Sequence, residues 1–375
     1  MTAKFSDIKT LVVKIGTTLL SNEHGFDGHV LEDVVKDLAR IKHGRGINLL
    51  IVSSGAMGCG MDRLGIQERP TALRLKQATA AVGQSRLMHL YETLFQTYGD
   101  GLHTAQVLLT AHDLDNRQSY LNVRNTINTL FEFENVVPIV NENDSTAPDE
   151  LRFGDNDTLA AKVAAKIDAD LLIILSNVDG LYDKDPVAHP EATLIRHVET
   201  VTHEVEDFAE DTFTPTSIGG MKTKLEAAKI ACASGLPTVI ANGHRKNVIS
   251  AVLDGDGPMT VFGASGNSMA HRKRWIAFGR ASKGSVKIDN GARAALVERG
   301  SSLLAAGIVA VDGGFEAGDA ITIQDSAGHD IARGLANYSS GDLGAIKGLK
   351  SQDIAAKLGR KDFDEVIHRD NLVIL

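Results

Sequence analysis

Residues 139–159, IVNENDSTAPDELRFGDNDTL, hold the densest group of side chains able to do chemistry. Positions 139–157 contain one Arg, three Asn (Asn141, Asn143, Asn156) and six acids (Glu142, Asp144, Asp149, Glu150, Asp155, Asp157). A solvated loop is one interpretation, because Asn and Asp form turns readily and Asp155 suits a helix N-cap. The apolar run at 136–140 instead predicts a buried parallel strand, and α/β proteins bind ligands where such strands end. We therefore predict that 141–144 lie on a binding face.

Two further segments have residue types that suit a phosphate group. After an apolar run at 11–13, Lys14, Gly16, Thr17 and Thr18 offer a cation, close backbone approach and two hydroxyls. A second apolar run, at 49–52, leads into SSGAMGCG, a glycine-rich helix start of the kind that binds anions. Its glycines match neither GxGxxG nor GxxxxGK[ST], so dinucleotide-fingerprint and Walker sites are excluded.

Strands and helices alternate along the first two thirds of the chain. We expect strands near 11–13, 49–52, 104–109, 136–140, 171–175 and 238–241, and helices near 30–41, 71–98, 117–133 and 225–234, the last opened by TSIGGMKTK. Repeated strand-then-helix order predicts a mainly parallel sheet covered on both faces.

Composition gives the broad class. The 375 residues are 43% apolar and 23% charged, as in globular proteins, and the length suggests two domains. Cys59 and Cys232 have no metal-ligand spacing, and no apolar run has signal-peptide or membrane-span character, so we expect a cytoplasmic protein without membrane contact. The net charge of −9 argues against nucleic-acid binding by the whole chain.

The amino-acid composition and the predicted secondary structure change near a basic segment. Residues 271–287, HRKRWIAFGRASKGSVK, contain six Lys or Arg and no acid, and short strands with frequent Gly follow from about Gly284. We predict a catalytic domain at 1–265, a basic linker at 266–283 and a small β-rich domain with a tail at 284–375.

Six motifs carry a family resemblance: VVKIGTTLL, IVSSGAMGCG, PIVNENDS, FGDNDTLAA, GLYDKDP and GGMKTKLEAA. In this order they resemble the amino-acid kinase family and, within it, the glutamate 5-kinases. HRKRW and ERGSSLLAAGI resemble the appended PUA domain. The resemblance implies a three-layer αβα sandwich around a mainly parallel sheet, and transfer of the ATP γ-phosphoryl, with Mg²⁺, to the side-chain carboxylate of L-glutamate, which starts proline biosynthesis.

The resemblance also implies roles for residues. Lys14 and Lys224 match the lysines that stabilise the transferring phosphoryl group, and Asp157 matches the acid that holds them. Glutamate would be bound by Ser54, Gly55, Asn141, Asp144 and Asn156. The nucleotide would be bound by Lys14, Gly16, Ser176, Asn177, Ile218, Gly219, Gly220, Met221, Lys222, Thr223 and Lys224. Ser176-Asn177, Ile218 and Lys222 depart from the usual family residues, whereas backbone contacts at Gly219 and Gly220 survive such changes. No residue is assigned to a metal.

The implied substrate fits the residue types. A glutamate carboxylate, with a pKa near 4.3, is already ionised, so the reaction needs positive charge rather than a general base. Asp144 suits the substrate ammonium, and hydroxyl and amide groups can donate to its carboxylates. Three alternatives stay open: a sister kinase acting on another carboxylate, carbamate or nucleotide, an RNA-binding protein acting through the PUA domain, and a regulatory protein without catalysis. The family further implies a homo-oligomer and feedback inhibition by proline.

Overall fold

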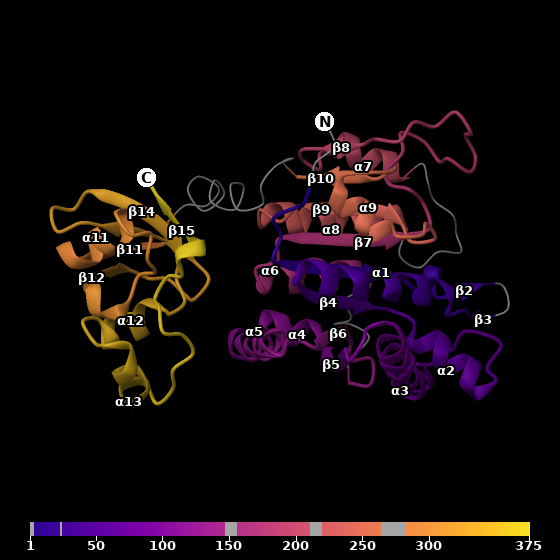
Figure 1. The fold of residues 1–375 in the computed structure, drawn as a ribbon, viewed down its shortest axis with the longest axis horizontal. Helices are drawn as coiled ribbons and strands as arrows, with labels where there is room; N and C mark the ends of the chain where they lie inside the picture. Colours follow the sequence, from indigo (N-terminus) through magenta and orange to yellow (C-terminus); the bar gives the residue numbers. More distant parts are fainter. Residues whose placement is uncertain (1–3, 23–24, 147–155, 211–219, 264–281) are drawn as a thin grey trace. The chain divides into compact units, whose positions relative to one another are not determined.

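The computed structural model describes residues 4–22, 25–146, 156–210, 220–263 and 282–375. The chain forms two compact units, Met1–Ser268 and Met269–Leu375 (Figure 1). Each unit has its own apolar core and is described by itself.

An eight-stranded sheet forms the centre of the first unit. Its order is β5 (His103–Leu109), β6 (Val136–Glu142), β4 (Asn48–Ser53), β1 (Thr10–Ile15), β7 (Leu171–Ser176), β9 (Thr238–Asn242), β10 (Thr260–Phe262) and β8 (His197–Val198). The pairings from β5 to β9 are all parallel, whereas β10 runs antiparallel to β9 and parallel to β8. A short ribbon pairs β2 (Ser21–Asn22) with β3 (Gly25–Phe26). All six predicted strands are present.

Helices cover both faces of this sheet. The first unit contains α1 (His29–Arg45), α2 (Ala56–Leu64), α3 (Leu73–Tyr98), α4 (Ala111–Asp115), α5 (Arg117–Glu132), α6 (Asn156–Lys166), α7 (His203–Glu210), α8 (Met221–Ala233) and α9 (Val248–Asp254). One core lies between the sheet and α1, α3 and α9, and the other lies between the sheet and α4, α5, α6 and α8. The result is the predicted three-layer αβα sandwich (Figure 1).

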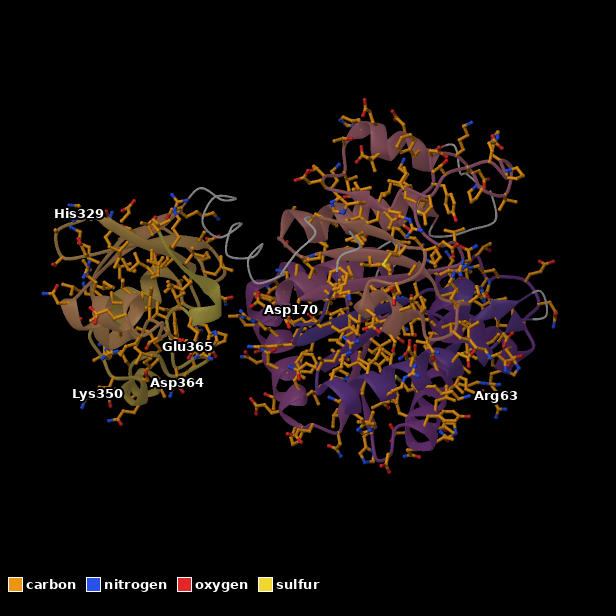
Figure 2. All side chains as sticks on the ribbon, turned by 45° about the horizontal axis from the view of Figure 1, so that its top comes forward. Arg63, Asp170, His329, Lys350, Asp364 and Glu365 are labelled. Carbon is orange, nitrogen blue, oxygen red and sulfur yellow. The ribbon has the colours of Figure 1, made fainter. Side chains whose placement is uncertain are left out.

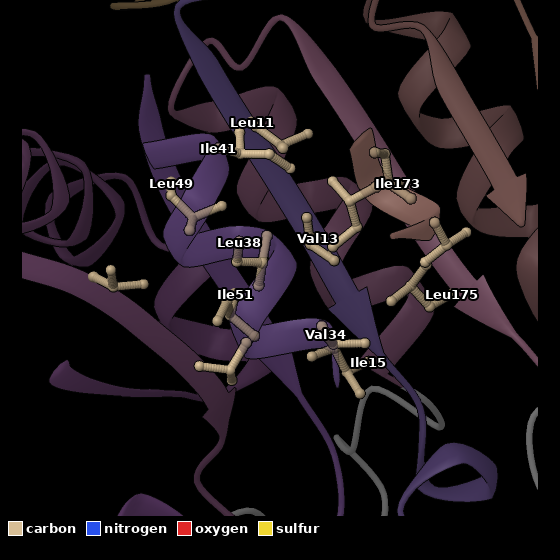
Figure 3. Close-up of a cluster of buried hydrophobic side chains, with 14 of the residues drawn as sticks. Leu11, Val13, Ile15, Val34, Leu38, Ile41, Leu49, Ile51, Ile173 and Leu175 are labelled. Atoms are coloured by element: carbon tan, nitrogen blue, oxygen red, sulfur yellow. The ribbon is translucent and has the colours of Figure 1, made fainter. Parts of the chain in front are cut away.

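Alternation along the buried strands sends side chains to the two layers. Leu11, Val13 and Ile15 of β1 pack with Val34 and the rest of α1's apolar stripe (Figure 3), whereas Val12 belongs to the opposite core. Because successive side chains of a strand point to opposite faces, Lys14 lies on the side of Val12, where α6 and α8 pack. The sequence of one strand therefore directs a lysine toward two particular helices.

Two helix ends differ in how well their sequences mark them. Gly46 adopts a left-handed conformation (φ 63°) and ends α1, as the glycines after the apolar stripe predict. By contrast, α8 begins at Met221, four residues before the predicted start at Leu225. Gly220 is its N-cap and provides no side-chain hydrogen bond, so the usual sequence signal is absent. Lys224 therefore lies in the first turn of α8.

The second unit is a small mixed β structure. Its sheet has the order β12 (Ile308–Gly313), β11 (Gly284–Ile288), β13 (Ala320–Gln324), β14 (Asp330–Leu335) and β15 (Leu372–Ile374). The helices α11 (Asn290–Val297), α12 (Ser340–Ile346) and α13 (Ile354–Leu358) accompany it. Its core includes Val286, Phe315, Ile321 and Tyr338. This is the β-rich domain that the sequence predicts.

Charged side chains of both signs lie on both units. Figure 2 labels Arg63 and Asp170 on the first unit, and Lys350, Asp364 and Glu365 among those on the second. No helix in the described part of the chain is long and apolar enough to cross a membrane.

Candidate active site

The carboxyl ends of β6, β4, β1 and β7 meet at one edge of the first unit's sheet. The register pairs Ile15 with both Ser53 and Leu175, so the chain leaves these strands at nearly the same level. A cleft of about 320 Å³ opens there, and we call it the central cleft. Its walls come from the turns after β1, β4 and β6 and from the first turns of α2, α3, α6 and α8.

Two lysines and one aspartate form a buried charged cluster in this cleft. The Lys14 ammonium lies 2.5 Å from Oδ1 of Asp157, and the Lys224 ammonium lies 3.2 Å from Oδ2. The Thr223 hydroxyl donates to Oδ2 over 2.9 Å. Asp157 is fully buried, and the two lysine side chains are only 6% and 9% exposed. Three distant segments, β1, α6 and α8, are thereby joined through one carboxylate.

The cluster sets the protonation state of its acid. Burial alone would raise the pKa of Asp157, but the Lys14 and Lys224 ammonium groups and their hydrogen bonds hold it below the ordinary value of 3.8. Asp157 also lies in the first turn of α6, where the helix dipole favours a negative charge. The carboxylate is therefore ionised at neutral pH. Two lysine ammonium groups therefore share this one carboxylate.

An amide network lies beside this cluster. The Asn156 amide nitrogen is directed at three acceptors: the Ser53 carbonyl at 2.7 Å, the Asn141 side-chain oxygen at 2.8 Å and the Ser54 hydroxyl at 3.1 Å. The Asn141 amide nitrogen donates over 2.8 Å to Gln84 of α3. Asn141 is 3% exposed. The network connects the ends of β4 and β6 with the start of α6.

Two glycines that line the cleft leave little room for a side chain. A Cβ atom on Gly16 would come within 3.0 Å of the Lys14 ammonium nitrogen. Gly55 has φ 105°, a backbone conformation that residues other than glycine rarely adopt. A Cβ atom on Gly55 would also lie 2.9 Å from the Leu20 side chain. Gly55 is the N-cap of α2 and has no side chain that could occupy the first-turn N–H groups, and Gly55, Ala56 and Met57 line the cleft.

A second cavity, of about 130 Å³, shares Thr18 and Lys224 with the central cleft. Its other polar lining residues include Ser176, Asn177, Tyr182 and Asp185, and Val178, Leu181 and Val187 supply apolar surface. The Thr260 hydroxyl holds the backbone of the lining residue Leu181, because it accepts a hydrogen bond from the Leu181 N–H (2.8 Å) and donates to the Ile195 carbonyl (2.6 Å). Lys224 thus lies where the two cavities meet.

The predicted site residues fall into four groups. The central cleft is lined by Lys14, Gly16, Ser54, Gly55, Asn141, Asp144, Asn156, Asp157 and Lys224. The second cavity is lined by Ser176, Asn177, Gly220, Met221 and Lys224. Thr223 bonds Asp157, whereas Lys222 is exposed and lines neither cavity. Ile218 and Gly219 lie outside the described residues.

The sequence-based prediction missed several lining residues. Arg69 and Lys76 line the central cleft, and Tyr182 and Asp185 line the second cavity. GLYDKDP already marked the latter pair as part of a motif, without a role. Arg69 and Lys76 precede and open α3, where nothing in the pattern separates them from ordinary surface cations. Among the residues that the structure describes, no three His, Cys, Asp or Glu side chains gather as metal ligands.

Comparison with known proteins identifies the family. The model of the "Amino acid kinase family" matches residues 9–242, which include the whole Lys14–Asp157–Lys224 cluster. The chain belongs to the amino acid kinase family. This amino acid kinase also matches the PUA domain at residues 284–358, within the second unit.

Three curated relatives of this amino acid kinase share its full length, and each is named glutamate 5-kinase. The protein of Moorella thermoacetica is 45% identical over 99% of this chain and 97% of its own. The protein of Syntrophus aciditrophicus is 43% identical over 98% and 95%, and that of Dehalococcoides mccartyi is 44% identical over 98% of each chain. The predicted fold class and family are thereby confirmed.

Proposed function

We propose that the protein is a glutamate 5-kinase, which transfers the γ-phosphoryl group of ATP to the side-chain carboxylate of L-glutamate. The product is L-glutamyl 5-phosphate, and the reaction is the first step of proline biosynthesis. The names of the full-length relatives support this activity. The observation that carries it is the Lys14–Asp157–Lys224 cluster, which places two lysines on the central cleft and reaches the second cavity through Lys224.

The chemical step requires neither a base nor an acid. A γ-carboxylate oxygen of glutamate forms a bond to the γ-phosphorus of ATP while the bond from that phosphorus to the β,γ-bridging oxygen breaks, and ADP leaves with the bonding pair. The carboxylate is ionised at neutral pH, so no proton has to move. The barrier arises from bringing two anions together and from charge on the transferring oxygens.

The lysine cluster addresses that electrostatic problem. In our proposal Lys14 and Lys224 donate to the oxygens of the transferring phosphoryl group, in a cleft where water screens their charge only weakly. Asp157 holds both ammonium groups without neutralising both. Fixed donors of this kind need no reorganisation during the reaction, which is the usual source of such stabilisation.

The two cavities suit the two substrates. The central cleft would hold glutamate, with Asp144 near its ammonium group and the Ser54 hydroxyl free to donate to a carboxylate. The second cavity would hold part of the nucleotide, near Ser176, Asn177 and the start of α8. Magnesium would enter as MgATP, because Mg²⁺ is commonly held by substrate phosphates and water with one or two carboxylates. Asp157 is occupied by the lysines, so the triphosphate and water would supply most of its ligands.

We further expect a cytoplasmic homo-oligomer that proline inhibits, as the family resemblance implies. The two free cysteines, Cys59 and Cys232, are compatible with a reducing compartment. The charge of residues 284–375 does not favour binding to the phosphates of RNA, because these residues include ten Lys or Arg and thirteen Asp or Glu.

A coupled ADP-release assay tests the proposal. L-Glutamate, N-acetylglutamate, L-aspartate and UMP are compared as acceptors at equal MgATP, with Lys14→Met as the inactive control. We expect turnover with L-glutamate and little with the other three. Preferred turnover of N-acetylglutamate or UMP would instead support a sister kinase of the same family, and turnover unaffected by Lys14→Met would exclude the lysine cluster.

A further inference from the structure

The orientation of two side-chain amides in the central cleft is fixed by backbone groups. The Asn156 amide nitrogen lies 2.7 Å from the Ser53 carbonyl, which can only accept. The Asn141 side-chain oxygen lies 2.8 Å from the Glu142 N–H, which can only donate. Amide oxygen and nitrogen are otherwise hard to distinguish, and these two contacts leave one choice for each group.

These orientations determine what Asn156 can offer to a ligand. Both of its N–H bonds are engaged by the acceptors of Ser53, Ser54 and Asn141. Its side-chain oxygen accepts no hydrogen bond from any residue that the structure describes, although Asn156 lines the cleft. Asn156 therefore presents an acceptor and not a donor. The sequence suggests that this amide donates to a substrate carboxylate, but in the structure it cannot. It can instead accept a hydrogen bond from an ammonium group.

Gln84 completes this arrangement from outside the cleft. Its side-chain oxygen accepts from the Asn141 amide nitrogen over 2.8 Å, and its own amide nitrogen donates over 3.1 Å to Gln106 on the edge strand β5. Gln84 does not line the central cleft. Without it, the nearly buried Asn141 amide nitrogen would lack an acceptor and the amide would turn toward another one, since unpaired buried donors are costly.

The geometry points to Gln84 as a positioning residue for substrate recognition. It holds the side-chain amide of Asn141, which in turn holds the side-chain amide of Asn156. In this orientation the side-chain oxygen of Asn156 accepts a hydrogen bond from the α-ammonium group of the acceptor amino acid. Asp144 supplies the negative charge for the same group, and the amide relay supplies a neutral, directional partner. This inference rests on the proposed function, which makes an α-amino acid the acceptor.

The α2–α3 pair keeps the relay rigid. A Cβ on Gly83, the neighbour of Gln84, would lie 1.7 Å from the Ala56 carbonyl, and one on Gly60 would lie 1.9 Å from the Thr79 carbonyl. The two helices therefore pack backbone to backbone, and α2 begins at the wall of the cleft. Gln84 is fixed relative to that wall, which a positioning residue requires.

Steady-state kinetics on two Gln84 variants test the relay. Gln84→Met removes the acceptor, and we expect KM for L-glutamate to rise about 10-fold or more, because hydrogen bonds to charged groups contribute at least this much. KM for ATP should change less than 2-fold. Gln84→Glu keeps an oxygen for Asn141, and the exposed Gln106 amide can turn to donate to it, so KM for glutamate should stay within 3-fold of wild type. Gln96→Met, a surface glutamine of the same helix, is the control.

A double-mutant cycle separates the relay from a general loss of structure. If Gln84 acts through Asn156, then Gln84→Met should add less than 2-fold to KM in an Asn156→Ala background. The inference is overturned if Gln84→Met leaves KM for glutamate within 2-fold, raises both KM values together, is matched by Gln84→Glu, or adds its full effect to Asn156→Ala. These outcomes all presuppose that the wild type phosphorylates glutamate, so absence of that activity would refute the proposed function separately.

Discussion

Asp157→Asn tests whether one carboxylate holds the charged cluster together. The variant keeps the shape of the side chain but removes the carboxylate that Lys14 approaches to 2.5 Å and Lys224 to 3.2 Å. The two lysine side chains, which are only 6% and 9% exposed, then lose the carboxylate that they share. At such burial water offers little compensation for the lost charge.

The expected loss of folding stability in Asp157→Asn follows from this geometry. Removing one partner of a buried ion pair costs about 3–5 kcal/mol, because the remaining charge stays buried and uncompensated. Here one carboxylate serves two lysines, so we expect the upper part of that range. For a unit of this size, a loss of 1 kcal/mol lowers the midpoint of thermal unfolding by roughly 2–4 °C. The unfolding midpoint of the first unit should therefore fall by on the order of 10 °C.

Scanning calorimetry of the full chain measures this loss. Asp33→Asn, on the exposed side of α1, is the matched control and should shift the transition by less than about 0.5 kcal/mol. Kinetics on the same samples should show kcat reduced by roughly 100-fold or more, since the lysines lose their fixed positions. An Asp157→Asn protein as stable as the control would refute the assignment of Asp157 as the anchor of both lysines.

The lowered pKa of Asp157 predicts how the loss of stability in Asp157→Asn depends on pH. The pKa of Asp157 lies below 3.8 in the folded protein, so its stabilising contribution is complete above 3.8 and is lost as pH falls through the lowered folded value. The stability gap between wild type and Asp157→Asn should therefore stay constant from pH 8 to 5 and narrow only below 3.8. A gap that closes between pH 7 and 5 would contradict the lowered pKa.

Four further predictions concern the site and the domain boundary. Lys224→Met should lower kcat by roughly 100-fold or more, whereas Lys229→Met on the exposed side of α8 should not; normal kcat in the former would remove Lys224 from the mechanism. Asp144→Asn should raise KM for glutamate much more than KM for ATP, and equal increases would argue against contact with the substrate ammonium. Gly16→Ala should lower kcat because its Cβ would lie 3.0 Å from the Lys14 ammonium nitrogen, with the exposed Gly44→Ala as control; unchanged kcat would show that Lys14 can move freely. Ending the chain after Gly266 should leave a folded kinase with kcat within a fewfold of the full chain; loss of activity in a truncated protein that circular dichroism shows to be folded would mean that the site needs the second unit.

The sequence by itself determined the sheet and much of the charged cluster. A short, fully apolar run such as 171–175 is typical of a strand buried on both sides, as in a parallel sheet with helices on both faces. Lys14 follows such a run, and alternation along the strand fixes its face. The family motifs then identified Asp157 and Lys224 as its partners. These inferences are local, because each depends on a few consecutive residues.

Only the tertiary structure decided how the amides are oriented and which side chains support them. Gln84 lies 57 positions from Asn141 in sequence, and nothing in the helix containing it distinguishes it from a surface glutamine. The start of α8 was also misplaced, because its N-cap is a glycine without a capping side chain. Direction in a hydrogen-bond network is a collective property: the Ser53 carbonyl and the Glu142 N–H fix it, and they meet the two asparagines only when β4, β6 and α6 are packed together.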